Sequence, residues 1–327
     1  MLKTLPTDLN NLDKIFQEIQ NLHILVVGDL ILDQYIWGKV ERISPEAPVP
    51  IITVSRKENR LGGAGNVAAN LSALECPVTL AGVCASDQAG RDLQTLCHQK
   101  KINSIIATLP ERRTSCKARI IAQQQQLLRI DEETVEPVDQ KETEQLLKNI
   151  TALADQFDAV ILSDYAKGLV TEDFIQSILE IFKDKPVLVD PKGFNYQKYR
   201  GATALKPNFR EFCMAVRHPE LTLAKIEPLA RQLIDELNLK GLIVTLGEQG
   251  VFVLDTDQKA ALIPTKAREV FDVSGAGDTF IAVFTAVLMV TNDWKIAAVV
   301  ANLASGIAVG KIGTATVTTA EILAEDY

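Results

Sequence analysis

The chain has 327 residues, of which 47% are hydrophobic and 23% are charged, as in an ordinary globular protein with a sizeable core. Its formal net charge of −8 argues against nucleic acid or an acidic membrane surface as the main partner. Five cysteines without a Cys-x-x-Cys pair argue against a disulfide framework or a zinc site, and they favour a reducing cytoplasm.

Two features of the sequence bear on membrane targeting. The first 20 residues carry acidic side chains among leucines and lack the basic start of a signal peptide. The apolar region 280–310 is interrupted at residues 291–295, which leaves runs shorter than the ~20 residues that a membrane span needs. We therefore expect buried core helices in this region.

Taken in order, the hydrophobic pattern predicts alternating helices and strands. A helix at 10–20 precedes an apolar strand at 23–28, and the alternation continues with helices at 67–74 and 88–99 and strands at 78–84 and 103–107. Helices at 140–156 and 172–182 alternate in the same way with strands at 159–163 and 187–189. Such an order predicts a parallel sheet with right-handed crossovers.

Residues 34–56 depart from this pattern. Two segments in which apolar and polar residues alternate flank the proline-rich loop 44–50. Two half-buried strands joined by a stiff loop predict a small β flap that serves as a lid, a dimer contact or both. A strand-like segment at 114–130 is a second candidate for this lid.

Several polar residues follow predicted strands, where open α/β sheets bind their ligands. Asp29 and Asp33 follow the strand at 23–28, and each is either a sugar ligand or a turn aspartate. Gly62, Gly63 and Asn66 open the next helix, which indicates either close backbone approach to a polyol or only a tight helix start. Segments 163–168 and 190–193 also follow predicted strands.

Basic residues gather at 112–119 of this acidic protein. Lys117 and Arg119 point the same way along a predicted strand. They either bind a ligand phosphate or keep an exposed edge strand from pairing with another chain. Further along, Asn208 and Glu211 have the spacing of a capping box at a helix start. Strands at 241–247 and 250–254 predict a hairpin.

The most informative stretch is residues 272–278, because a long apolar helix at 279–290 follows it directly. The turn from Ser274 to Gly277 leaves the first helix amides free to bind an anion, and the helix dipole adds positive charge there. Asp278 then places a carboxylate beside an anion site, which suits a base that deprotonates the hydroxyl attacking a phosphoryl group. A capped structural helix is the alternative, although capping alone does not need Gly275 and Gly277. A second small-residue helix is predicted at 297–310.

These residues resemble the ribokinase-like carbohydrate kinases over nearly the whole chain. The resemblance rests on Gly62, Gly63 and Asn66 and on Asp272-x-x-Gly-Ala-Gly-Asp278, with Asn208-x-x-Glu211, Thr245-Leu-Gly247 and Ala301-Asn302 in matching order. It implies a three-layer α/β/α fold with a mostly parallel central sheet and a small β-strand lid. Residues 1–327 would then form one kinase domain with the lid inserted at about 34–56.

Within that family the chain is similar to the heptose-phosphate kinases of ADP-heptose synthesis. This narrower resemblance rests on 28–33, on Arg42-Ile-Ser-Pro-Glu-Ala-Pro-Val-Pro50, on 60–66, on Ser163-Asp-Tyr-Ala-Lys-Gly168 and on 190–193. It implies ATP-dependent phosphorylation of the anomeric hydroxyl of D-glycero-β-D-manno-heptose 7-phosphate, for lipopolysaccharide core synthesis. Another sugar or nucleoside kinase, or a non-catalytic sugar-phosphate sensor, is the alternative. Whether a nucleotidyltransferase domain belongs to the same gene product stays open.

The resemblance also implies roles for individual residues. Asp278 is the catalytic base, and the amides of Gly275, Ala276 and Gly277 form the anion hole. The sugar phosphate is expected to bind Asp29, Asp33, Arg42, Gly62, Gly63, Asn66, Lys117, Arg119 and Lys192. ATP is expected to bind Asn208, Phe209, Arg210, Glu211, Thr245, Gly247 and Asn302.

The same resemblance implies the cofactors, whereas the assembly is inferred from the flap. Glu211 would order Mg²⁺ through water, and Asp272, Ser274 and Gly313 resemble the monovalent-cation site, for K⁺, of some relatives. The flap implies a homodimer, with neither nucleic acid nor a membrane as a partner.

Overall fold

A computed structural model describes residues 11–123, 125–255, 260–265 and 270–325. Its main sheet has nine strands in the order β13-β12-β11-β10-β9-β8-β1-β4-β5. All neighbouring pairs are parallel except β11 with β12 and β12 with β13, which are antiparallel. The strands are β1 (Ile24–Gly28), β4 (Val78–Ala85), β5 (Asn103–Leu109), β8 (Ala159–Ser163), β9 (Val187–Asp190), β10 (Ala204–Leu205), β11 (Gly241–Thr245), β12 (Val251–Asp255) and β13 (Ala260–Ile263).

Helices cover both faces of this sheet, as the alternating side chains of β1 show. Ile24 and Val26 pack into one core, whereas Leu25 and Val27 pack into the other. The first core is closed by α1 (Leu12–Ile19), α2 (Ala64–Ala73), α3 (Gln88–Gln99), α8 (Ala276–Thr291), α9 (Trp294–Ala308) and α10 (Thr319–Leu323). The second is closed by α4 (Gln140–Thr151), α5 (Glu172–Ile181), α6 (Phe209–Ala215) and α7 (Ile226–Leu237).

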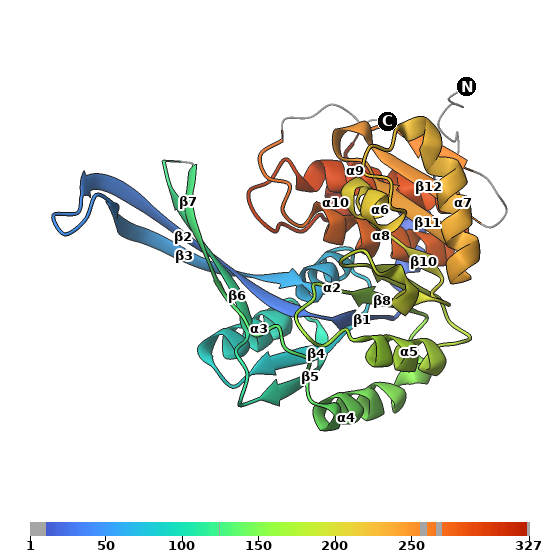
Figure 1. Ribbon diagram of the computed structural model, residues 1–327, viewed down its shortest axis with the longest axis horizontal. Coiled ribbons are helices and arrows are strands. Elements are labelled where there is room, and N and C mark those ends of the chain that lie inside the picture. The colour runs from blue at the N-terminus through green and yellow to red at the C-terminus, as the bar shows by residue number, and fades with distance from the viewer. Residues whose placement is uncertain (1–10, 124, 256–259, 266–269, 326–327) are drawn as a thin grey trace.

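A second sheet projects from this body as a long arm (Figure 1). Its four strands, in the order β3-β2-β6-β7, are β2 (Leu30–Ile43), β3 (Pro50–Gly63), β6 (Ser115–Ala122) and β7 (Gln125–Glu132). Only Asp29 separates β1 from β2, so the chain passes directly from the central sheet into the arm. The arm therefore begins where the carboxyl end of β1 opens, the edge at which α/β sheets bind ligands.

The predicted fold class, three layers with a small β sheet, is confirmed. The boundaries differ in places: α2 begins at Ala64 rather than at 67, and the helix predicted at 140–156 ends as an α-helix at Thr151. Strands β7, β10 and β13 and helices α7 and α10 were not predicted as separate elements. The core helices expected at 279–290 and 297–310 are present as α8 and α9, and no helix in the described ranges is long and apolar enough to cross a membrane.

Candidate active site

Asp278 lies in the first turn of α8, with 2% of its surface exposed. Its Oδ2 accepts a hydrogen bond from Nδ2 of Asn66 at 2.8 Å, and its Oδ1 accepts one from the hydroxyl of Tyr165 at 2.6 Å. Burial, reinforced by the negative charge of Asp190, raises the pKa of Asp278 to about 7. A carboxylate with this pKa is suited to accept a proton near neutral pH.

The glycine turn before α8 presents backbone donors beside this carboxylate. Gly275 is the N-cap, with a left-handed φ of +80°. The amide of Ala276 donates to the carbonyl of Val273 at 3.3 Å, whereas the amides of Gly275, Gly277 and Asp278 have no hydrogen-bond acceptor among the described residues. Two of the three amides expected to form the anion hole are therefore free, and that of Ala276 is used by the turn.

A buried cation also lies at this turn. Nζ of Lys206 is 2.9 Å from Oδ1 of Asp190, and a Cβ added to Gly277 would lie 3.2 Å from the same nitrogen. Lys206 is only 4% exposed. Lys206 is not among the predicted site residues, although a lysine that directly follows the apolar pair Ala204-Leu205 is typical of a strand end.

Asp29 is held by a neighbouring loop. Its carboxylate accepts hydrogen bonds from the backbone amides of Tyr165, at 2.9 Å, of Lys167, at 3.0 Å, and of Leu169, at 3.3 Å. Asp29 has 2% of its surface exposed, and this burial raises the pKa of its carboxylate. Much of its acceptor capacity therefore serves the loop at 164–169.

Gly62 and Gly63 lie against the two predicted sugar-binding aspartates. A Cβ at Gly62 would lie 2.5 Å from Oδ2 of Asp33, and one at Gly63 would lie 2.6 Å from the carbonyl oxygen of Asp29. Gly63, with a φ of +56°, therefore allows a close approach of two backbone segments, and a Cβ at Gly62 would displace the Asp33 side chain. The predicted approach of this turn to a polyol stays a prediction. The structure brings these four residues and Asn66 to one end of β1 and α2.

The predicted phosphate-binding cations do not form one cluster. Arg119 pairs with Asp33 at 2.5 Å, and Lys117 is half-buried beside Lys167, where burial lowers the pKa of Lys117. Lys192 instead pairs with Glu211 at 3.2 Å, at the start of α6. Arg42 lies near the tip of the arm, opposite Ile51 in the register of β2 with β3. It is nine residues from Asp33, which is about 30 Å along the strand.

The residues expected to bind ATP gather around α6 and β11. Asn208 caps α6, and Glu211 completes the predicted capping box with bonds of 2.9 and 3.1 Å. Asn208 also bridges Thr245 at the end of β11, and Gly247 follows with a φ of +62°. Phe209 and Arg210 form the first turn of α6, whereas Asn302 on α9 bonds to Pro264 and Thr265.

Asp272 contacts the other two residues that resemble a monovalent-cation site, Ser274 and Gly313. Its Oδ1 accepts from the amide of Ser274 and its Oδ2 from the amide of Gly313, each at 2.9 Å. In the part of the chain that is described, no group of three or more His, Cys, Asp or Glu side chains could hold a metal ion.

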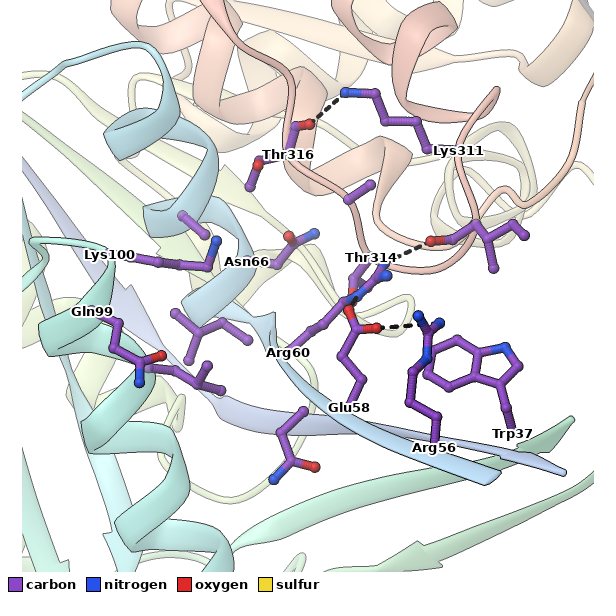
Figure 2. Close-up of a pocket in the computed structure, with 16 residues that line it drawn as sticks. Trp37, Arg56, Glu58, Arg60, Asn66, Gln99, Lys100, Lys311, Thr314 and Thr316 are labelled. Atoms are coloured by element: carbon purple, nitrogen blue, oxygen red, sulfur yellow. Dashed lines mark hydrogen bonds and ion pairs between the residues drawn. The ribbon is translucent and has the colours of Figure 1, made fainter. Parts of the chain in front are cut away.

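A cavity of about 740 Å³ lies on the arm side of Asn66 and Thr314. Figure 2 shows Arg60 and Lys311 on its walls, but Arg60 pairs with Glu58 at 2.6 Å and Lys311 pairs with Glu321 at the same distance. Arg56 shares Glu58 with Arg60, and Lys100 also lines the cavity, so these ion pairs neutralise its cations only in part. It adjoins the Asn66–Asp278 pair without containing the carboxylate.

Comparison with known proteins agrees with this geometry. The model of the pfkB family carbohydrate kinases matches residues 21–321. The chain belongs to the pfkB family. Among curated relatives, this pfkB kinase is 43% identical over 320 residues to the bifunctional protein HldE of Trichlorobacter lovleyi and 40% identical over 316 residues to that of Geobacter metallireducens. It aligns over 97% and 96% of its own length, and it spans about 65% and 64% of the length of those two relatives.

Solved structures show the same fold for the pfkB chain. Phosphofructokinase-2 from Escherichia coli superposes with a TM-score of 0.76 at 16% identity, covering 92% of this chain and 97% of that one. Ribokinase from Arabidopsis thaliana, complexed with ribose and ATP, gives 0.72 at 19% identity, with the same coverage. These likenesses confirm the ribokinase-like architecture inferred from the glycine motifs.

Proposed function

We propose that this chain is an ATP-dependent kinase that phosphorylates the anomeric hydroxyl of D-glycero-β-D-manno-heptose 7-phosphate. The observation that carries the reaction type is the buried Asp278 carboxylate at the free amides of α8. Membership of the pfkB family and the 40–43% identity to HldE proteins support the sugar-phosphate class. The product would supply ADP-heptose for lipopolysaccharide core synthesis in the cytoplasm.

In the proposed reaction, Asp278 accepts the proton of the sugar hydroxyl as that oxygen attacks the γ-phosphorus of ATP. The free amides of Gly275 and Gly277, with the nearby Lys206 cation, stabilise the charge on the transferred phosphoryl group. Mg²⁺, when bound with the nucleotide, neutralises phosphate charge, and Glu211 at the start of α6 is the side chain proposed to orient its water. K⁺ at Asp272, Ser274 and Gly313 stays part of the proposal.

The sugar phosphate is proposed to lie between β1, α2 and the base of the arm. Asp29, Asp33 and Asn66 face this region. Lys117 lies opposite Asp33 on the neighbouring strand β6, and Arg119 forms an ion pair with the Asp33 carboxylate. Lys192 contacts Glu211 and so belongs with the nucleotide side of the site. Residues 1–327 form one kinase domain in this proposal, and the arm excludes water and joins two subunits.

The test is a substrate panel with coupled detection of ADP. The β and α anomers of heptose 7-phosphate are compared with mannose, ribose and fructose 6-phosphate. Turnover with the β-heptose phosphate at least tenfold above the others supports the assignment. Preferential turnover of ribose or a fructose compound would establish a ribokinase-type or fructokinase-type enzyme, and sugar-phosphate binding without ADP release would establish a sensor.

A further inference from the structure

Tyr165 is the second hydrogen-bond donor to Asp278, and it comes from a loop far from α8 in the sequence. Its phenolic oxygen is 2.6 Å from Oδ1 of Asp278, while Asn66 occupies Oδ2. Each carboxylate oxygen therefore has one side-chain donor. Nothing in the glycine motifs indicates this contact, because it depends on how the loop after β8 folds back over the site.

The loop that carries Tyr165 is anchored on both sides of this residue. Before it, the buried Asp164 carboxylate accepts from Nζ of Lys198 and from the hydroxyl of Tyr199, both at 2.6 Å. After it, Ala166 adopts a left-handed φ of +54° and its amide donates to Asp164 at 2.7 Å. A non-glycine residue keeps such a conformation only where the surroundings hold it.

Asp29 holds the same loop from the opposite side. The backbone amide of Tyr165 donates to Asp29 at 2.9 Å, and the amides of Lys167 and Leu169 donate to the same carboxylate. Tyr165 is thus fixed by its backbone to one active-site carboxylate and by its side chain to the other. Fixed donors of this kind impose a direction on the group that they bind.

We propose that Tyr165 is a positioning residue that orients the Asp278 carboxylate and favours its ionised form, and this inference rests on the proposed role of Asp278 as the base. The phenol donates its proton to the carboxylate and keeps it through turnover. Burial, then the charge of Asp278, raises the pKa of Tyr165 well above its ordinary value, which agrees with a phenol that stays protonated.

Other charged groups act on the same carboxylate. Asp190 opposes the ionisation of Asp278, whereas Lys206 favours it. Asp190 and Asp33 also raise the pKa of the Tyr165 phenol. Of the groups that favour ionised Asp278, Tyr165 and Asn66 make direct hydrogen bonds, so loss of the phenolic hydroxyl should raise the pKa of Asp278.

The test is Tyr165→Phe, measured by two independent readouts. In protein labelled with ¹³C at the aspartate carboxyls, the resonance that disappears in Asp278→Asn reports the titration of this group without substrate. We expect Tyr165→Phe to move this titration upward by about one pH unit. In turnover, the acid limb of the kcat profile should move by the same amount, with kcat at pH 7 about fivefold lower, recovery at higher pH and an unchanged KM for ATP.

Tyr196→Phe is the matched control, because the buried hydroxyl of Tyr196 has no hydrogen-bond partner among the residues that the structure describes. It should change neither the titration nor kcat at pH 7. The proposal is overturned if the Asp278 titration of Tyr165→Phe stays within 0.3 pH unit of the wild-type value. A shift of this size is about twofold in the equilibrium constant. If the titration shifts but the wild-type protein transfers no phosphate to any sugar, Tyr165 still orients Asp278, and the kinase assignment is the part that fails.

Discussion

Asn66 and Asp278, which are 212 positions apart, are joined by a hydrogen bond of 2.8 Å between two buried side chains. The bond links the glycine-rich start of α2 to the glycine-rich start of α8. Gly275 lies at the same contact, since a Cβ there would be 2.5 Å from Nδ2 of Asn66. The two sequence motifs therefore build one site, and each constrains the backbone of the other.

Asp278→Asn should fold and lose about 10³-fold or more in kcat. The amide keeps the size of the side chain but cannot accept the proton of the attacking hydroxyl. Steady-state rates at saturating ATP and sugar phosphate measure the effect, with circular dichroism as the control for folding. Turnover close to that of the wild type would remove Asp278 from the chemistry.

The same substitution predicts a change in how stability depends on pH. The pKa of Asp278 is about 7 in the folded protein and near 3.8 in the unfolded chain, so the folded state binds the proton more tightly. The stability associated with this group is present below pH 4 and is lost as the pH rises to about 7. Relative to Asp278→Asn, the wild type should lose on the order of 4 kcal/mol of unfolding free energy across this window.

Urea denaturation of both proteins at pH 5, 6, 7 and 8 measures this difference. The difference should grow with pH and level off above pH 7. A difference that is constant from pH 5 to pH 8 would show that the folded carboxyl titrates below pH 5, close to the unfolded value.

Gly275→Ala should reduce both stability and activity. Alanine disfavours the left-handed φ of +80° by about 1–2 kcal/mol, and its Cβ would displace the Asn66 amide from Asp278. Thermal unfolding and kcat report the two effects. Gly201→Ala is the control, because Gly201 has a φ of +90° but nothing within 4 Å of an added Cβ. It should lose stability alone, and an equal loss of kcat in both variants would contradict the contact.

Arg119→Ala and Lys192→Ala should separate the two substrate sites. Arg119 pairs with Asp33 at the base of the arm, so its loss should raise KM for the sugar phosphate about tenfold or more and leave KM for ATP unchanged. Lys192 contacts Glu211 at the start of α6, so its loss should raise KM for ATP instead. Initial rates with each substrate varied in turn test the assignment. The opposite pattern would exchange the two cations.

Leu128→Asp should dissociate the proposed dimer. Leu128 and Ile130 on β7 are 54% and 44% exposed, and a stable interface buries roughly 800 Å² per partner with an apolar centre. Sedimentation of the wild type and the variant over a range of concentrations measures the change. Gln126→Asp adds the same charge to β7 without removing apolar surface. A wild-type protein that sediments as a monomer at high micromolar concentration would exclude this role for the arm.

Local physical chemistry explains which parts of the fold the sequence predicted. Short apolar runs such as 159–163 form buried parallel strands, and the Asn208 capping box depends only on groups three residues apart. The two-residue strand β10 has too few residues to show a period. The edge strands β7 and β13 are largely exposed, so their hydrophobic signal is weak.

The sequence by itself determined the ribokinase-like architecture and the glycine-opened turn at Asp278, because both depend on periodicity and on residues close along the chain. Tertiary structure alone decided that Tyr165 and Asn66 bond to Asp278, that Lys206 approaches the glycine turn and that Lys192 pairs with Glu211. These contacts join strand ends and loops that are distant in sequence. Their geometry follows from the packing of the whole sheet, which no local pattern encodes.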